Sequence, residues 1–439
     1  MPQREVRRAV AGLPVTVAPW VALVFLGASV LYLSWWGLEP TVGGDTGDYQ
    51  QVARSVGDGW ASTLHDRTPG YPLVLWLTAS TSSLTPALTL LQLACHLTAA
   101  WITLVLLERF AVPRWLTITV AVGLVSPPLT EKAFHGLTEA VTEVLLVVAV
   151  WSFVRWRERA TPVWAVSCGV ALGAAGLVRP TYQAAGLLLA AWIGVWLWRR
   201  ESRRAALRGA AALATGTAVL IGGLAGFNLV RFGYPGTTPL LGWNLSTRTA
   251  LFVEALPEGE PDRPVLIAAR NDALVNGESH SAVMYIWPAR PEVEQAVGLQ
   301  GTDLDRYMVR LNLRLIAGNP FDYLLAVGGA AAGYVLPATT DKASGGTRVG
   351  QAAFGVAHLA VLAGFIAQGF GFVGLYVARR LGAEITGPFA TDEARRVWLT
   401  GVALISLSLA GAPPPSAAGN LTLTAVDGIK VGHFTMAGR

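Results

Sequence analysis

Long apolar runs separated by short polar segments dominate the chain. A membrane-spanning helix needs about 20 apolar residues, so we expect these runs to be membrane-spanning helices: 15–37, 84–107, 115–130, 138–154, 162–178, 181–198, 209–230, 353–377 and 397–411. The run 70–80 is apolar but shorter, and we expect it to dip into the membrane interface. The pattern predicts an all-α polytopic membrane protein with about nine or ten transmembrane helices.

Arginine clusters mark one side of this predicted bundle. They precede the first run and then follow alternate runs: Arg4, Arg7 and Arg8; Arg109 and Arg114; Arg155, Arg157 and Arg159; and Arg199, Arg200, Arg203, Arg204 and Arg208. The positive-inside rule makes that side cytoplasmic. The N-terminus is therefore expected inside the cell and the loop 38–69 outside it. The run 15–37 is too long for a signal-peptide core, so we expect it to remain as an uncleaved first span in the cell membrane.

The second half of the chain has a different pattern. Residues 231–322 are mostly polar, and such a length predicts a large extracytoplasmic loop rather than a passive connection. The stretch 323–338 is apolar but rich in glycine. If it spans the membrane, Arg379 and Arg380 lie outside; if it lies in the outer interface, 353–377 runs inward and both arginines are cytoplasmic. The distribution of positive charge favours the second interpretation.

Composition supports a membrane protein. Charged residues make up 14% of the chain and hydrophobic residues 53%, with a mean hydropathy of +0.47. The charged share is well below the roughly 25% of ordinary globular proteins. The net charge of +5 would suggest an anionic partner in a soluble protein, but membrane orientation explains the arginines without a nucleic acid. Cys95 and Cys168 lie inside apolar runs, so we expect buried thiols rather than a disulfide or a metal pair.

Two closely spaced carboxylates, Asp45 and Asp48, stand in the first predicted outer loop, which also carries Asp58 and Asp66, in a chain that otherwise avoids charge. Asp45, Asp48 and Tyr49 would share one face of a short helix. The two acids are candidates for a divalent metal site, or for a general base with an orienting partner. Arg67 has the planar fork that matches phosphate oxygens, and His65 is a supporting candidate. The alternative is a solvated loop with Asp48 near a helix N-terminus.

The next two predicted outer loops add further candidates. Glu139 opens a span, where it either interacts with the helix dipole or joins a catalytic site. His135 precedes it by about one turn and is a supporting candidate. Glu143, one turn deeper, needs a partner if it is buried. Arg179 could pair with Glu139 or Asp45, bind an anionic lipid phosphate, or reach the interface with its charged end. Such a gathering predicts an active site at the outer surface of the bilayer.

These motifs resemble the start of a known family. The first predicted span, the two loop motifs that follow it, the later Thr-Glu and Val-Arg-Pro motifs and the large outer loop stand in the order of the GT-C membrane glycosyltransferases. The chain is most similar to bacterial relatives of the dolichyl-phosphate-mannose protein mannosyltransferases and of the lipid A aminoarabinose transferase. The resemblance covers about residues 15–377 and rests on 43–53 (GGDTGDYQQVA), 67–72 (RTPGYP), 138–139, 178–180 and 319–324.

The resemblance implies an inverting transfer of a sugar from a polyprenyl-phosphate donor to a lipid, glycan or protein acceptor. Asp45 matches the family's loop acid, which deprotonates or orients the acceptor, with Asp48 and Glu139 as further catalytic candidates. Arg67 and Arg179 are the phosphate-binding candidates, and Tyr49 is a supporting residue. Some members use a divalent metal, for which Asp45 and Asp48 would be the ligands, and others do not.

The C-terminus departs from the family. We expect residues 1–411 to form the transferase domain and 412–439 to be a fused or truncated fragment without activity, because 420–433 resembles the opening of the P1 peptidases without their catalytic part. A chain truncated in this way would lack part of the acceptor region and could be inactive. Two other functions stay open: a transporter or lipid-linked-sugar flippase, for which His96 and Gln92 inside the second span are the main indication, and a membrane scaffold or O-antigen ligase-like enzyme.

Overall fold

The computed structural model describes residues 18–43, 45–57, 59, 64–110, 114–198, 203–275, 289–335 and 352. Across these residues the fold is all-α and contains no strand, which confirms the predicted fold class at that level. The residues fall into two units that divide between Thr238 and Pro239. The predicted spans 353–377 and 397–411, the tail 412–439 and Asp58 lie outside the described residues.

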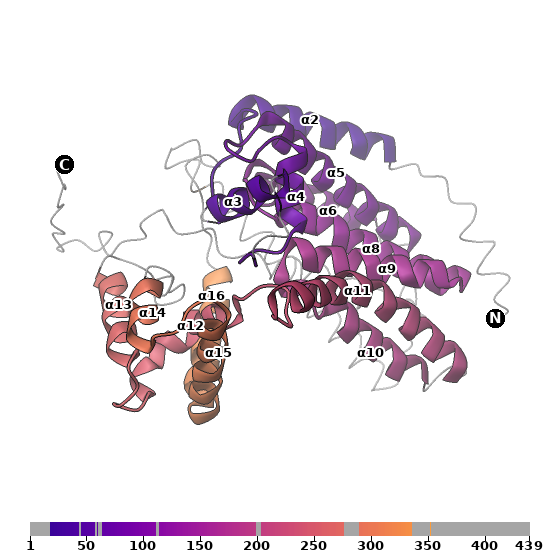
Figure 1. Ribbon diagram of the computed structural model, residues 1–439. Helices are drawn as coiled ribbons and strands as arrows, with labels where there is room; N and C mark the ends of the chain where they lie inside the picture. The colour runs from indigo at the N-terminus through magenta and orange to yellow at the C-terminus, as the bar shows by residue number, and fades with distance from the viewer. Residues whose placement is uncertain are drawn as a thin grey trace, which may run out of the picture. The chain divides into compact units, whose positions relative to one another are not determined.

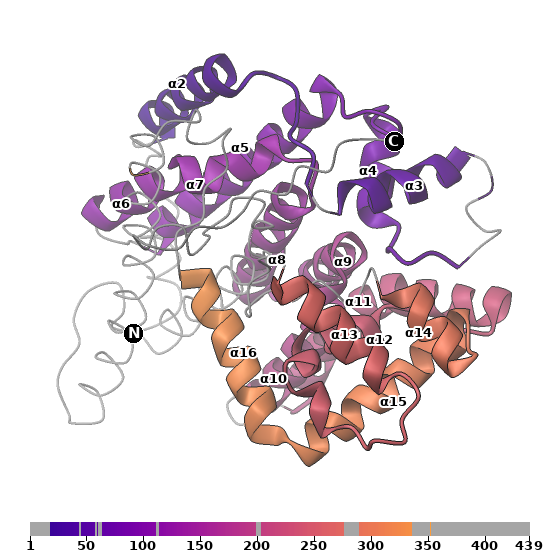
Figure 2. The same ribbon diagram turned by 90° about the vertical axis from the view of Figure 1, so that its left-hand side faces the viewer.

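The first unit is a set of packed helices with short segments between them (Figure 1). Its elements are α2 (Ala18–Trp36), α3 (Thr46–Gly57), α4 (Gly70–Leu77), α5 (Pro86–Arg109), α6 (Arg114–Leu124), α7 (Pro127–Thr130), η2 (Glu131–Phe134), α8 (Glu139–Arg159), α9 (Pro162–Val178), η3 (Pro180–Tyr182), α10 (Ala185–Trp198) and α11 (Arg203–Phe232). Helix α9 packs against both α8 and α11, α5 packs against α8, and α3 lies beside α4 (Figure 2).

Small residues bring α9 and α11 close together. A Cβ atom on Gly169 would lie 2.0 Å from the carbonyl oxygen of Leu213, so only glycine fits where the two backbones meet. Leu172, Ile193 and Phe153 fill the core beside this contact. Close packing of this kind is typical of helices in membranes. The hydrophobic effect does not drive helix association there, and small residues let the backbones approach closely.

Each predicted span between residues 15 and 230 coincides with helix, but one of them is broken. The helix expected over 115–130 ends at Leu124, and α7 begins at Pro127. Proline has no backbone N–H to donate to the preceding turn of a helix, so it ends or breaks a helix. The two consecutive prolines, Pro127 and Pro128, therefore explain the break. The 11 residues of α6 are about 17 Å long and too short to cross a bilayer alone.

Among the described helices, two are long and apolar enough to cross a membrane: Pro86–Arg109 and Leu207–Phe232. Leu23–Trp36 and Pro162–Val178 are apolar but shorter. Two such helices are weak support for a polytopic protein, because core helices of soluble proteins and signal sequences have the same length and composition. The membrane placement of the chain therefore stays a prediction.

The second unit has a core of its own. It comprises α12 (Leu241–Thr249), η4 (Ala250–Ala255), α13 (Arg263–Val275), α14 (Arg290–Val297), α15 (Gly301–Gly318) and α16 (Pro320–Val335). Helix α15 is amphipathic, and its buried side chains Leu304, Met308, Leu311 and Leu315 follow helical spacing. The large loop predicted over 231–322 is thus a folded helical unit where it is described. Helix α16 covers most of the stretch 323–338.

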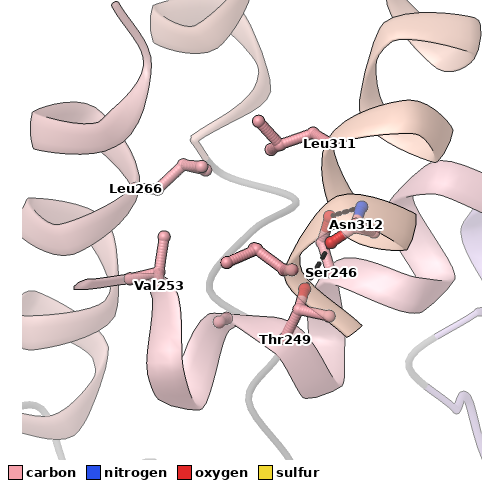
Figure 3. A pocket seen from close by; sticks show the side chains of 8 residues that line it. Ser246, Thr249, Val253, Leu266, Leu311 and Asn312 are labelled. Atoms are coloured by element: carbon pink, nitrogen blue, oxygen red, sulfur yellow. Dashed lines mark hydrogen bonds between the residues drawn. The ribbon is translucent and has the colours of Figure 1, made fainter. Parts of the chain in front are cut away.

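Asn312 joins α15 to α12 in the second unit. Its amide nitrogen donates to the Gly242 carbonyl at 2.9 Å and to Ser246 Oγ at 2.8 Å, and its oxygen accepts from the Thr249 hydroxyl (Figure 3). A small cavity beside it is closed by apolar side chains, among them Val253, and is no larger than about one water molecule. The cavity is therefore a packing gap and not a ligand site.

Candidate active site

Arg67 binds the two aspartates of the first loop through one nitrogen. Its Nη2 donates to Asp45 Oδ1 at 2.9 Å and to Asp48 Oδ2 at 2.7 Å. Asp45 directly precedes α3 and Asp48 lies in its first turn, where the unpaired backbone N–H groups of a helix favour negative charge. Arg67 comes from the segment that enters α4. The structure thus brings together three of the residues that the sequence predicted.

Tyr49 forms the wall of this cluster. The Arg67 guanidinium lies 5.2 Å from the centre of the Tyr49 ring, and that ring meets Tyr71 edge-on at 5.1 Å. Burial raises the pKa of Tyr49 to about 12, although the Arg67 charge acts in the opposite direction. Burial alone would lower the pKa of Arg67, but the Asp45 charge raises it above its ordinary value. The cluster therefore contains a charged arginine against a neutral phenol.

A second ion pair lies next to the first. Arg179 Nη1 is 3.3 Å from Glu139 Oε1, and the two side chains are only 11% and 12% exposed. Glu139 opens α8, and Arg179 follows the last residue of α9. The segments of Arg67 and Arg179 adjoin where Gly70 of α4 meets Leu177 of α9, which sets the second pair beside the first. Of the two partners considered for Arg179, the structure selects Glu139.

Two buried polar atoms in these pairs have no hydrogen-bond partner among the described residues. They are Arg67 Nε and Glu139 Oε2. A buried polar atom without a partner costs roughly 1–3 kcal/mol, and such atoms are found where a ligand supplies the missing bond. One is a donor and the other an acceptor. The site is therefore suited to a ligand that carries both an anionic group and hydroxyl groups.

Backbone contacts between two loops hold Asp45 in place. Thr41 N–H donates to the Phe134 carbonyl at 2.7 Å, and Gly136 N–H donates to the Thr41 carbonyl at 2.9 Å. The buried Thr46 hydroxyl donates to the Gly136 carbonyl at 3.0 Å and accepts from Gly43 N–H at 2.8 Å. Thr46 follows Asp45 directly, so the second loop fixes the position of the first.

Gly70 determines how closely α4 approaches α9. A Cβ atom there would lie 2.6 Å from the Leu177 carbonyl and from the Val178 nitrogen. The first turn of α4 therefore touches the last turn of α9, next to Arg179. This contact brings the segment of Arg67 to the segment of Arg179.

Gln92 is a site residue that the sequence indicated only indirectly, as a polar side chain inside an apolar run. It accepts from the Tyr71 hydroxyl at 3.2 Å and donates to the carbonyls of Ala133, at 3.2 Å, and His135, at 2.7 Å. All three of these hydrogen bonds join Gln92 to other residues of the first unit. Gln92 therefore supports the aromatic wall and the second loop, and this accounts for its place in an apolar helix.

The predicted supporting histidines have partners of their own. His135 Nε2 lies 3.0 Å from Glu131 Oε1, with both side chains almost fully buried. His65 Nε2 lies 3.3 Å from Ser55 Oγ on α3. Both rings thus contact residues next to the two loops. Their contribution in this structure is to the positions of the loops.

The carboxylates do not form a metal site as they lie. Within the described ranges no three His, Cys, Asp or Glu side chains come together in a way that could hold a metal ion. Asp45 and Asp48 converge, but on the Arg67 guanidinium, so a cation would compete with an existing positive charge. The metal predicted for these two residues stays a prediction.

Comparison of the chain with protein-family models, with curated proteins and with solved structures finds no match.

Proposed function

We propose that the chain is an integral membrane glycosyltransferase that moves a sugar from a polyprenyl-phosphate donor to an extracytoplasmic acceptor. The observation that carries the proposal is the convergence of Arg67 with Asp45 and Asp48, next to the Arg179–Glu139 pair. Arginines that can take a phosphate lie beside carboxylates that can take a proton. The motif order of the GT-C family, on which the resemblance rests, supports the same reaction.

The proposed reaction uses these groups in two ways. Arg67 and Arg179 bind the phosphate, and Asp45 accepts the proton of an acceptor hydroxyl. The acceptor oxygen then attacks the anomeric carbon, and the bond from that carbon to the phosphate oxygen breaks with its electron pair remaining on the phosphate. The face opposite the leaving group is attacked, so the anomeric configuration inverts. Positioning of the two substrates and general base catalysis accelerate the transfer.

Binding of the donor requires a rearrangement of ion pairs. Arg67 Nη2 is already bonded to two carboxylates, so a phosphate that binds across Nε and Nη2 displaces at least one of them. Arg67 Nε is buried and without a described partner, and it supplies a further donor to the same phosphate. Displacement would turn Asp45 from a partner of arginine into a partner of the acceptor. In this proposal, donor binding therefore precedes proton removal.

The membrane placement is part of the proposal. It rests on the alternation of arginine clusters along the sequence, on the low share of charged residues and on the two described helices of membrane length. The active site then lies outside the cell and the N-terminus inside. A donor with a polyprenyl chain fits a site at the end of apolar helices, because the chain stays in the bilayer while its phosphate reaches the arginines.

A transporter or flippase is the second candidate, and one ion pair favours it. His96 Nδ1 lies 2.9 Å from Glu143 Oε2, between the middle of α5 and the second turn of α8. Ionisable residues inside membrane helices mark transport and proton pathways. His96 Nε2 also meets the Leu124 carbonyl at 2.9 Å, which ties the ring to the end of α6. This pair gives the half-buried Glu143 a partner.

The test is sugar transfer in membranes that contain the full chain. Polyprenyl-phosphate donors labelled in the sugar are added, and label in lipid, glycan and protein fractions is counted for the intact chain and for Asp45→Asn. Asp303→Asn is the matched control, because Asp303 also pairs with an arginine, Arg306, at 3.0 Å, but in the second unit. We expect transfer with the intact chain and the control, and none above background with Asp45→Asn.

Two results would contradict the proposal. Equal transfer by Asp45→Asn would remove Asp45 as the base. Movement of labelled donor across the bilayer without any transfer, abolished by His96→Ala, would establish the second candidate in its place.

A further inference from the structure

The two ends of α8 carry opposite kinds of charged residue. Glu139 begins the helix and Arg155, Arg157 and Arg159 lie in its last turns. Arg155 follows Glu139 by 16 positions, or about 24 Å along the axis. This is close to the roughly 30 Å thickness of the hydrocarbon layer of a bilayer. The arginine end is thus far from the candidate active site and, in the proposed orientation, faces the cytoplasmic leaflet.

Tryptophan rings hold each of these three arginines. The Arg155 guanidinium lies 4.9 Å from the Trp151 ring centre and 6.0 Å from that of Trp164. Arg159 also lies 6.0 Å from Trp164. Trp151, Arg155 and Arg159 recur at four-residue intervals, so they form one stripe along α8. Trp164 on α9 extends this stripe across the turn between the two helices.

Arg157 makes a similar contact on another face of α8, because it is two positions from both Arg155 and Arg159. Its guanidinium lies 5.7 Å from the centre of the Trp156 ring. Trp156 is buried against α11, where a Cβ atom on Gly209 would lie only 2.0 Å from the indole ring. The backbone of a second helix therefore fixes the ring on which Arg157 rests. Guanidinium groups held in this way lose less freedom when they bind a ligand.

The Arg155 and Arg159 guanidinium groups lie near tryptophan rings, and a guanidinium in such a contact can still donate from the N–H groups at its edge to an anion. Arg155 Nε is buried and has no hydrogen-bond partner within the described residues. The nearby acids do not cancel the charge. Glu158 binds Arg109 and lies 3.7 Å from Arg155, and Glu108 precedes Arg109.

Apolar side chains next to the arginines point to the source of that anion. Val163, in the first turn of α9, is 61% exposed, and Val170, two turns along the same helix, is 41% exposed. Both follow the turn that carries Arg159. A phosphate at the arginines would therefore have apolar surface next to it along α9. A soluble anion would not pack against that surface, whereas the acyl chains of a lipid would.

The geometry points to a binding site for an anionic phospholipid, with its headgroup phosphate on Arg155 and Arg159 and its acyl chains along α9. We call these two arginines with Trp151 and Trp164 the arginine–tryptophan patch. Anionic lipids of the cytoplasmic leaflet attract basic residues by about 1 kcal/mol each, or roughly fivefold in affinity. The site rests on the proposed membrane placement and is independent of the proposed transfer reaction.

Binding of short-chain lipids to the purified full chain tests the patch. Dioctanoyl phosphatidylglycerol, dioctanoyl phosphatidylcholine and glycerol phosphate are each titrated in a non-ionic detergent, and bound molecules are counted by native mass spectrometry. We expect the intact chain to prefer phosphatidylglycerol over both other ligands. The double variant Arg155→Gln/Arg159→Gln should bind it about 25-fold more weakly, at about fivefold for each lost charge.

Two further variants separate the patch from general charge. Arg306→Gln/Arg310→Gln removes two exposed arginines of the second unit, and we expect unchanged affinity. Arg155→Lys/Arg159→Lys keeps the charge but loses the planar fork, so affinity should fall severalfold with the fold intact. Equal losses in the two glutamine variants, unchanged affinity in the lysine variant, or equal binding of glycerol phosphate would each overturn the lipid site. None of these readouts needs sugar transfer, so failure of the proposed enzyme leaves the result interpretable.

Discussion

Arg67 reaches Asp45 through Nη2, the same nitrogen that it gives to Asp48, and leaves its Nε buried without a described partner. One guanidinium thus binds two carboxylates at the start of α3 while keeping a donor unused. A phosphate that binds to this arginine gains the unused donor and competes for the shared one. The resting arrangement therefore contains both the phosphate-binding group and the proton acceptor, in contact with each other.

The two aspartates are expected to differ in their effect on transfer. Asp45→Asn should lower the rate of sugar transfer by about 10²–10⁴-fold, the usual contribution of a general base. Asp48 is 61% exposed at its side chain, so Asp48→Asn should lower the rate by less than about tenfold, because an exposed ion pair contributes little. Initial rates with a labelled donor measure the difference. Equal losses would mean that the two acids act as one unit.

Arg67→Lys is expected to affect the donor more than the acceptor. Lysine keeps the positive charge but loses the fork that reaches two oxygens at once. The KM for the polyprenyl-phosphate donor should rise by about tenfold or more, since a hydrogen bond to a charged group contributes roughly 1.5–3 kcal/mol. The KM for the acceptor should stay within about twofold. A rise in the acceptor KM alone would show that Arg67 binds the acceptor and not the donor.

The Arg179–Glu139 pair should contribute to stability only as a pair. Both side chains are nearly buried, and removal of one partner from such a pair costs roughly 3–5 kcal/mol because the other charge is left uncompensated. We expect Arg179→Gln to destabilise the full chain by about 3 kcal/mol, and Arg179→Gln/Glu139→Gln to recover more than half of that loss. Thermal unfolding in detergent measures both. Additive losses in the double variant would show that the residues do not interact.

Gly70→Ala should destabilise the site from a distance. The added Cβ would meet the Leu177 backbone at 2.6 Å, and forced overpacking costs roughly 1–3 kcal/mol. Gly223→Ala is the matched control in α11, because a Cβ there meets nothing within 4 Å and alanine favours helix. We expect Gly70→Ala to lower the melting temperature and the transfer rate, and Gly223→Ala to lower neither. A neutral Gly70→Ala would mean that α4 and α9 can separate without effect on Arg67.

The sequence predicts some contacts of the candidate site and not others. Asp45, Asp48 and Arg67 could be predicted to meet because the two acids stand at the start of one helix and the arginine lies in the same loop. Arg179 with Glu139 could be predicted as one of two pairings. The bonds of Thr46 to Gly136 and of Gln92 to His135 could not, because they end on backbone carbonyls, whose positions depend on the packing of separate helices. A polar residue in an apolar run indicates such a bond but not its partner.

Asp262 gives the second unit a pH dependence of its own. Its carboxyl is fully buried and accepts from the Tyr307 hydroxyl at 2.9 Å. Burial raises the pKa of Asp262 above its ordinary value of 3.8, although the bond from Tyr307 acts in the opposite direction. A raised pKa in the folded state means that the protonated form is favoured by folding. Its contribution to stability is complete below pH 3.8 and is lost as the pH rises through the raised pKa.

Asp262→Asn should therefore flatten this part of the stability profile. Melting temperatures of the intact chain and of the variant are compared at intervals between about pH 3 and pH 7, where ordinary and raised aspartate pKa values fall. We expect the intact chain to lose stability relative to Asp262→Asn as the pH rises. Tyr307→Phe removes the bond that opposes the shift, so the loss should extend to higher pH. Parallel profiles for the intact chain and Asp262→Asn would show that Asp262 has the same pKa folded and unfolded.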